Sequence, residues 1–284
     1  MSVRTQHFVF NISAAALLAG MALPAAADPT RCERVWRLGY TFRWADGSGA
    51  GSVRGVDYDL IALLAQRASG CPMIQVQLPL TRVLKQIESG EIDVNGQKVC
   101  TPERGRYAWL LPYLRGKNHV LFRRDRGVAE SAEAALGDDG LSIGIVRGGV
   151  YGAAYDAQIA RLRAAGRIVE VPDLDTLYHQ FRIGRFGAIV STPPTYVAML
   201  GERYLRESVR VVDWAPGEPV YPVCLLLSRK RFSADQAARI AEVLQGMRRD
   251  GSIQRIVERY LGAAAARDLV LPADVPAMLE LPVP

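Results

Sequence analysis

The stretch of this sequence with the richest potential chemistry is GQKVCTPERGRYAWLLPY, residues 96–113. It is too polar for a core strand and too apolar for a free loop, and it carries the arginine Arg104 near its centre. That arginine has two interpretations: a solvated surface charge, or a fixed cation that binds an anionic ligand. A guanidinium suits the second role because its planar fork matches a carboxylate. The choice depends on the elements that surround it.

The composition is that of a soluble globular protein. The chain has 284 residues, enough for one large or two modest domains, with 49% hydrophobic and 23% charged residues. The formal net charge of +6 fits contact with anionic partners. Lysines and arginines are scattered, and no nucleic-acid-binding motif is present, so we expect no nucleic-acid partner.

The residue pattern at the N-terminus is typical of a targeting segment. Arg4 and His7 precede an apolar run, residues 8–23, and the small residues 25–27 follow it before Asp28. A charged start, a short apolar middle and a small-residue cleavage site predict a secretory signal peptide over residues 1–27. We therefore expect a mature chain that begins near Asp28 and resides in an oxidising compartment. A lipid anchor is not expected, because no cysteine stands at the cleavage point.

All four cysteines lie after the predicted cleavage site, so an exported protein could form up to two disulfides. Cys32 comes just before the first predicted strand and Cys71 just before the second. If those strands are parallel neighbours, their starts are adjacent, and we predict a Cys32–Cys71 bridge. Cys100 and Cys224 are expected as buried thiols, with a second bridge as the alternative. A metal site is not expected, because there is no CxxC and the histidines are dispersed.

The first half of the chain alternates strands and helices. Apolar periodicity predicts a strand at 35–40, a helix at 57–68, a strand at 73–80, a helix capped by Thr81, and a strand from 92. This order implies a parallel sheet with helices on its faces.

The same order occurs again after residue 126. We predict strands at 141–146, 168–171 and 187–191, with helices at 151–165 and 174–183 between them. A strand at 220–228 and helices at 234–249 and 252–261 complete the pattern. The last twenty residues contain four prolines and are expected to form an extended tail.

Several short motifs, in order, carry a family resemblance. They are GVDYDL at 55–60, LKQIESGEID at 84–93, TPER at 101–104, PY at 112–113, the strand and turn at 143–149, the return strand at 220–230 and the closing helices at 246–261. Together they resemble the extracellular solute-binding proteins of family 3. Order and spacing hold from about residue 35 to 262.

The resemblance implies an α/β fold of the two-lobed, type II periplasmic-binding-protein kind. Each lobe is a sheet flanked by helices, and two hinge strands join the lobes. Lobe 1 would comprise residues 28–114 and 222–284, and lobe 2 residues 115–221. Ligands of open α/β sheets bind beyond the carboxyl ends of the strands, here in the cleft between the lobes.

The resemblance also implies a function. Such proteins capture an amino acid or related organic acid in the periplasm for an ABC importer, without a cofactor and without changing the solute chemically. We expect a monomer with a transporter permease as partner. One alternative is a sensing or accessory binding protein for a periplasmic partner. Another is an enzyme resembling cyclohexadienyl dehydratase, which would need a general acid in the cleft; Glu103 and Asp57 are the acids we can place near it.

On the first lobe, Arg104 matches the family arginine that holds the carboxylate of the ligand. Gln97 and Lys98 fall where family members place hydrogen-bond donors, although an outward position for Lys98 is equally open. Leu80 falls at the position of an aromatic lid. Tyr40 and Trp44, at the end of the first strand, could form an aromatic wall, with core or rim packing as the alternative.

On the second lobe, the backbone of Gly148, Gly149 and Val150 is expected at a helix N-terminus, where free N–H groups favour an anion, unless it is an ordinary turn. Thr192 stands where amino-acid binders commonly have an aspartate for the ligand ammonium. A threonine cannot supply that charge. Asp57 could compensate, although helix capping is its expected role. We therefore predict an acidic ligand and a weaker match to α-amino acids.

Basic residues flank the predicted crossing strand. They are Arg115, Lys117, Arg123, Arg124 and Arg126. We expect a solvated face, with electrostatic steering of anions into the cleft as the alternative.

Overall fold

The computed structural model describes residues 35–40 and 55–281 of the chain. The predicted signal peptide, the predicted bridge partner Cys32 and the predicted aromatic Trp44 lie outside the described residues. These three predictions therefore stay predictions.

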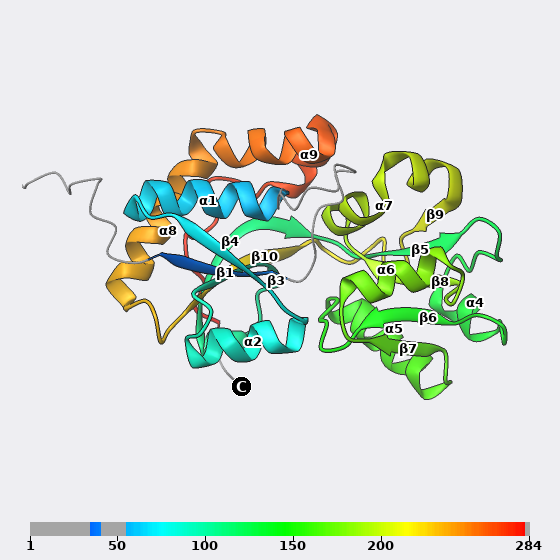
Figure 1. Ribbon diagram of the computed structural model, residues 1–284. Helices are drawn as coiled ribbons and strands as arrows, with labels where there is room; N and C mark the ends of the chain where they lie inside the picture. Colours follow the sequence, from blue (N-terminus) through cyan, green and yellow to red (C-terminus); the bar gives the residue numbers. More distant parts are fainter. Residues whose placement is uncertain (1–34, 41–54, 282–284) are drawn as a thin grey trace, which may run out of the picture.

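Two mixed sheets form the centres of two lobes (Figure 1). The first sheet has the strand order β2-β1-β3-β10-β4. These strands are β1 (Trp36–Tyr40), β2 (Met73–Gln77), β3 (Val94–Val99), β4 (Ala108–Gly116) and β10 (Tyr221–Ser228). β1 is parallel to both β2 and β3, as the alternation of strands and helices predicts. β10 runs antiparallel between β3 and β4, so the sheet is not purely parallel.

The second sheet repeats this plan with the order β7-β6-β8-β5-β9. Its strands are β5 (His119–Arg123), β6 (Ile143–Val146), β7 (Ile168–Val171), β8 (Ala188–Ser191) and β9 (Val209–Val212). β6 is parallel to β7 and β8, and β5 is antiparallel to β8 and β9. The antiparallel strands flank the two segments in which the chain crosses between the lobes: β4 and β5 at the first crossing, and β9 and β10 at the return. The alternation of strands and helices in the first half of the sequence did not predict their direction.

Helices cover both faces of the first sheet. On one face lie α1 (Val56–Ser69), α8 (Ala234–Arg249) and α9 (Ser252–Leu269), and on the other lies α2 (Leu80–Ser89) (Figure 1). Each face has its own apolar cluster: Leu60, Leu64 and Leu244 are fully buried in one, and Val83 and Ile87 in the other. Burial of such side chains stabilises the layers by roughly 1.5–3 kcal/mol each.

The second sheet is covered in the same way. α4 (Ala132–Leu136) and α5 (Ala153–Ala164) pack on one face, and α6 (Leu174–Arg182) and α7 (Pro193–Ser208) on the other. The short helix α3 (Pro102–Gly105) belongs to the first lobe and follows β3. The chain crosses between the lobes after β4 and returns before β10.

Leu80 differs from its predicted place at the end of a strand. β2 ends at Gln77, and Leu80 is the first residue of α2, with Pro79 at the N-cap position. Thr81 therefore cannot be the cap that we predicted. The fixed φ of proline favours this early start, because it is already compatible with the entry to a helix.

The end of the chain also differs from the prediction. α9 continues to Leu269 instead of ending at 261, although Gly262 interrupts it with a φ of 81°. The tail that follows is not free. Leu279 donates its N–H to the carbonyl of Leu110 at 2.9 Å, and Val270 pairs with Leu114, so the tail pairs with the outer edge of β4.

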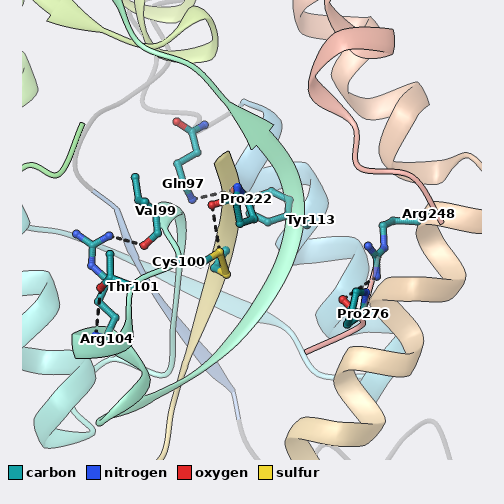
Figure 2. The surroundings of a disulfide bond; sticks show 10 residues. Gln97, Val99, Cys100, Thr101, Arg104, Tyr113, Pro222, Arg248 and Pro276 are labelled. Carbon is teal, nitrogen blue, oxygen red and sulfur yellow. Dashed lines mark hydrogen bonds between the residues drawn. A yellow bond between two sulfur atoms is a disulfide. The ribbon is translucent and has the colours of Figure 1, made fainter. Parts of the chain in front are cut away.

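A disulfide joins Cys100, just after β3, to Cys224 in β10, with 5.4 Å between the Cα atoms. The expectation of two buried thiols was wrong, and the alternative of a second bridge is confirmed. Register explains it: Lys98 and Val99 pair with Cys224 and Val223 in the antiparallel ladder, which brings Cys100, the first residue after β3, beside the return strand. Figure 2 shows the bridge beside Pro222, whose carbonyl accepts a hydrogen bond from the backbone N–H of Cys100 at 3.3 Å.

Candidate functional site

A cleft between the two sheets holds about 970 Å³ of space, part of it open to solvent. The carboxyl ends of β3, β6 and β8 meet at this cleft, as expected for an open α/β architecture. Seven of the ten predicted site residues line it: Leu80, Gln97, Lys98, Arg104, Gly149, Val150 and Thr192. The structure thus brings these residues together, while their role in binding remains a proposal.

Arg104 is aimed into the cleft by the local turn. The side chain of Thr101 caps α3 by accepting from the Arg104 N–H, and Pro102 stands at the first helical position. One guanidinium nitrogen donates to the carbonyl of Val99 at 2.6 Å, which turns the head of the side chain toward the end of β3 (Figure 2). Arg104 is only 5% exposed. The interpretation as a solvated surface charge is therefore excluded.

The environment of Arg104 is that of a cation without a counterion. Burial lowers the pKa of the guanidinium, and contacts with Tyr107 and Glu103 oppose that shift only in part. No carboxylate in the described part of the chain forms an ion pair with it. A guanidinium has five N–H donors, so several remain for a ligand.

Lys98 also turns inward, which decides between the two predicted orientations. It is 9% exposed and lines the cleft. Its ammonium donates to the carbonyls of Gly96 at 3.0 Å and Gln97 at 3.3 Å. Burial and repulsion from Arg104 lower the pKa of Lys98 to about 8, and attraction to Asp57 opposes this shift.

Gln97 occupies an unusual backbone conformation, with a φ of 51°. Left-handed backbone conformations are uncommon for residues other than glycine. The examples that exist are found disproportionately at binding sites. The backbone N–H of Gln97 donates to the hydroxyl of Tyr113 at 2.8 Å, and that hydroxyl donates to Asp57 (Figure 2 shows Gln97 and Tyr113). This network fixes the strand end that presents Lys98.

Asp57 is part of this network and not a helix cap. α1 has Gly55 at its N-cap and no capping hydrogen bond from a side chain, so the predicted capping role was wrong. Burial raises the pKa of Asp57 to about 6, against the hydrogen bond from Tyr113 and the charge of Lys98.

The glycine turn of the second lobe is not a helix N-terminus. α5 starts at Ala153, and the side chain of Glu218 accepts from the N–H of Ala154, so protein atoms already occupy that helix end. Gly149 donates its N–H to Val146. Gly149 and Val150 still line the cleft, but Gly148 does not. The alternative interpretation, an ordinary turn between strand and helix, fits these contacts.

The other side of the second lobe presents hydroxyl groups. Thr192, Thr195 and Ser191 line the cleft at the end of β8 and the start of α7. The hydroxyls of Thr192 and Thr195 lie 2.9 Å apart. Because residue 192 is a threonine and not an aspartate, this part of the cleft lining is polar but carries no negative charge.

Leu80 acts as a contact between the lobes. It belongs to the first lobe, yet it is buried in the apolar cluster of the second, which includes Val146, Val171 and Leu177. A second contact joins the lobes nearby, since the amide of Gln77 donates to Asp175 at 3.0 Å. Both contacts hold the lobes together over one side of the cleft.

Some predicted residues lie elsewhere, and some cleft residues were missed. Tyr40 does not line the cleft, so the described aromatic residues there are Tyr151 and Tyr221. Arg115 lines the cleft instead of a solvated face, and Asn118 joins the two tyrosines by donating to the Tyr151 carbonyl and the Tyr221 hydroxyl. Motif spacing gave no signal for the cleft position of Arg115 and Asn118, because they come from the first crossing segment. Tyr151 and Tyr221 were only weaker candidates for the aromatic wall.

The charge of the cleft is unbalanced. Three cations line it, Lys98, Arg104 and Arg115, against one described carboxylate, Asp173. Asp173 is already engaged as the cap of α6, where it accepts from the N–H of Thr176. The described lining is otherwise largely apolar, with residues such as Val99, Val146 and Val190. This arrangement favours an anionic group on a compact, partly apolar body.

The described residues show no cluster of metal-ligating side chains and no helix suited to span a membrane. No group of three or more His, Cys, Asp or Glu side chains there could hold a metal ion. None of the described helices combines the length and the apolar character required to cross a membrane.

Comparison with known proteins places this geometry in context. The family model described as bacterial extracellular solute-binding proteins, family 3, matches residues 40–263. No curated protein matches the chain.

Solved structures with the same fold are numerous. An ancestral arginine-binding protein bound to arginine matches with a TM-score of 0.66 at 18% identity, over 80% of this chain and 98% of that one. The arginine-, lysine-, histidine-binding protein ArtJ from the thermophilic bacterium Geobacillus stearothermophilus matches with 0.64 at 16% identity, over 81% and 96%. A histidine kinase sensor domain with similarity to periplasmic binding proteins matches with 0.65 at 17%, over 84% and 98%. At these identities the likeness shows the fold alone.

Proposed function

Because this chain belongs to the bacterial extracellular solute-binding proteins, family 3, we propose that it captures a small carboxylate-bearing solute between its lobes for an ABC importer. The expected working place is the periplasm, after removal of residues 1–27. We also propose the lobe boundaries stated above, residues 28–114 with 222–284 and residues 115–221. The crossing of the chain after β4 and its return before β10 support them.

The observation that carries the proposal is the unpaired, buried guanidinium of Arg104 in the cleft. Leaving a charge buried without a partner is costly, so a structure that keeps one has a strong demand for an opposite charge. A ligand carboxylate satisfies this demand by two parallel hydrogen bonds. Water can meet it only in part once the lobes close.

The charge of the cleft favours an acid over a basic amino acid. The neighbours named above include proteins that bind arginine, a cation. Here a ligand cation would meet three basic side chains, and the acidic Asp173 is engaged in helix capping. At a separation of about 5 Å and an effective dielectric constant of about 20, each unit charge would repel it by roughly 3 kcal/mol. A basic side chain on the ligand is therefore unfavourable at this site.

Binding is better supported than catalysis. A dehydratase needs a general acid within reach of the substrate. Glu103 is exposed, and neither Glu103 nor Asp57 is among the residues that line the cleft. The carboxylate that does line it, Asp173, is engaged as the cap of α6.

The test is a ligand screen on the purified protein with a matched pair of variants. Thermal unfolding over a panel of amino acids, keto acids and dicarboxylic acids should show an upward shift for some acids and none for arginine or lysine. Calorimetry should then give the affinity.

Arg104→Met should reduce that affinity by a hundredfold or more, about 3 kcal/mol, because it removes the charged fork. Arg106→Met, an exposed position two residues away, is the control and should bind normally. Tight binding to the Arg104 variant, or a panel in which only basic amino acids stabilise the protein, would refute the proposal.

A further inference from the structure

The cleft contains a second buried cation, Lys98, beside Arg104. A ligand with a single carboxylate, bound by Arg104, would leave the charge of Lys98 without a partner. Lys98 and Arg104 are 9% and 5% exposed, and both line the cleft. Neither forms an ion pair with a carboxylate of the described residues. Two buried like charges repel each other, which destabilises the charged form of both groups. A bound anion would relieve this repulsion.

The carboxylates near these cations are already engaged by the protein. Asp57 accepts a hydrogen bond from the hydroxyl of Tyr113 and another from the side chain of Gln97. Asp173 caps α6, and Asp156 accepts from the N–H of Tyr151. At Lys98 the repulsion from Arg104 exceeds the attraction of Asp57.

The hydrogen bonds of Lys98 leave one donor open. An ammonium has three N–H groups. The protein accepts from two of them, through the carbonyls of Gly96 and Gln97. These carbonyls anchor the ammonium at the end of β3 without neutralising it, and its position in the lining of the cleft makes the third donor available to a ligand.

We propose that Lys98 forms a second anion-binding position beside Arg104, and that the solute is a small dicarboxylic acid. Arg104 holds one carboxylate through its planar fork, and Lys98 attracts the other as a point charge. This inference rests on the proposed function, since it requires a carboxylate on Arg104. It goes beyond that function by naming the ligand class and the residue that selects it.

The experiment compares acids that differ by one carboxylate. Succinate, glutarate and adipate are titrated into the purified protein by calorimetry, each against the monocarboxylate of the same carbon number: butyrate, pentanoate and hexanoate. At least one diacid should bind tenfold or more tightly than its partner, as expected for one additional charge-assisted contact.

Substitutions of Lys98 test whether this residue causes the preference for a diacid over a monoacid. Lys98→Met keeps the length of the side chain and removes the charge, so the diacid should lose about tenfold to a hundredfold in affinity while the monoacid changes little. Lys98→Gln is a second form in case methionine disturbs folding, which thermal unfolding would reveal. Lys85→Met, at an exposed position of α2, removes the same charge outside the cleft and should preserve the preference.

The results distinguish failure of the second anion-binding position from failure of the proposed function. If wild-type protein binds monoacids and diacids equally, or if the Lys98 variants keep the preference, the second position is refuted while the role of Arg104 stands. If no carboxylate of either kind binds, the proposed function fails, and this inference fails with it.

Discussion

Thr195 on α7 donates a hydrogen bond to the side-chain oxygen of Gln97 on β3, 3.4 Å away, and so connects the two lobes across the cleft. Since the single hydroxyl proton of Thr195 points to Gln97, the hydroxyl of Thr192 must donate to Thr195 in their 2.9 Å contact. The amide of Gln97 also bonds to Asp57. A chain of polar groups thus runs from the second lobe into the first, through the residue with the strained backbone.

The first prediction concerns Thr195→Val, which keeps the shape of the side chain and removes the hydroxyl. The closed form should lose one hydrogen bond between the lobes, while each lobe keeps its own contacts. We expect ligand affinity to fall by about threefold to tenfold, corresponding to a net hydrogen bond of roughly 0.5–1.5 kcal/mol. Calorimetry measures the affinity, and small-angle scattering of the ligand-free protein should report a more open average shape.

Thr176→Val is the matched control for this substitution. Thr176 lies on α6 of the same lobe and does not line the cleft. It should bind as the wild type does. Equal affinity in the Thr195 and Thr176 variants would show that the bond between the lobes contributes nothing to binding.

The second prediction concerns the pH dependence of stability at Asp57. Burial raises the pKa of this carboxyl from 3.8 to about 6 in the folded protein. The folded state therefore keeps the proton to a higher pH than the unfolded chain, and its stability falls as the pH rises from about 4 to 6. Asp57→Asn should be more stable than wild type at pH 7–8 by roughly 1–3 kcal/mol, and the difference should vanish near pH 4. Urea unfolding across this range measures it.

Asp250→Asn supplies a control with the opposite sign. The hydrogen bonds from Ser252 and Arg67 lower the pKa of Asp250 to about 2, so its ionised form stabilises the fold above pH 4 and loses this effect in acid. This variant should be less stable than wild type at neutral pH. An Asp57 variant that is equally stabilised at pH 4 and pH 8 would contradict the raised pKa.

The parts of the cleft that could be predicted are those set by one strand and its following turn. The family resemblance placed Gln97 and Lys98, at the end of β3, and Thr192, after β8, on facing lobes. The strands of each sheet end at the edge that faces the cleft, which agrees with that placement. Arg104 was predicted from the resemblance of residues 101–104 to the TPER motif of the family, and the turn that carries it is local, since Thr101 and Pro102 specify the start of a short helix. Local sequence fixes both the turn and the direction of the side chain.

The features that the sequence left open or placed wrongly depend on pairings distant in sequence. Arg115 and Tyr221 enter the cleft because β4 and β10 pair in a particular register, which places Gly116 opposite Tyr221. The disulfide depends on the same strand, since Cys224 lies 124 residues after Cys100. Periodicity specifies that β10 is a strand but contains nothing about the neighbour with which it pairs.

The third prediction concerns that disulfide, which fastens the strand end carrying Lys98 to the return strand. Replacing Cys100 and Cys224 together by alanine should lower the free energy of unfolding by roughly 2–4 kcal/mol, because the unfolded chain regains the freedom of a long loop. Ligand affinity should also fall, since Arg104 lies only four residues beyond Cys100. Denaturant unfolding and calorimetry measure the two effects.

The double substitution is preferable to a reducing agent, because it leaves Cys32 and Cys71 untouched. Thiol counting on the unfolded wild type and variant confirms which cysteines were paired. Unchanged stability and unchanged affinity in the double variant would show that the bridge does not constrain the site.

The last prediction concerns the C-terminal tail. Arg248, only 7% exposed, donates to the carbonyls of Val275 at 3.0 Å and Pro276 at 3.5 Å, and so holds the tail against α8 (Figure 2). Leu279 then pairs with Leu110 on β4, the outer strand of the first sheet. The tail thus covers a strand edge that would otherwise offer unpaired backbone groups to another molecule.

Deleting residues 271–284 should therefore have two effects. Stability should fall by roughly 2–5 kcal/mol through loss of the buried Leu271 and the partly buried Leu279 and Leu281, and the exposed edge of β4 should promote self-association. Size-exclusion chromatography with light scattering, together with urea unfolding, measures both. Deleting only residues 282–284 keeps every contact described above and should leave both properties unchanged. A monomeric, fully stable protein without residues 271–284 would show that this segment neither stabilises nor protects the first lobe, because the loss of its contacts would then have no measurable consequence.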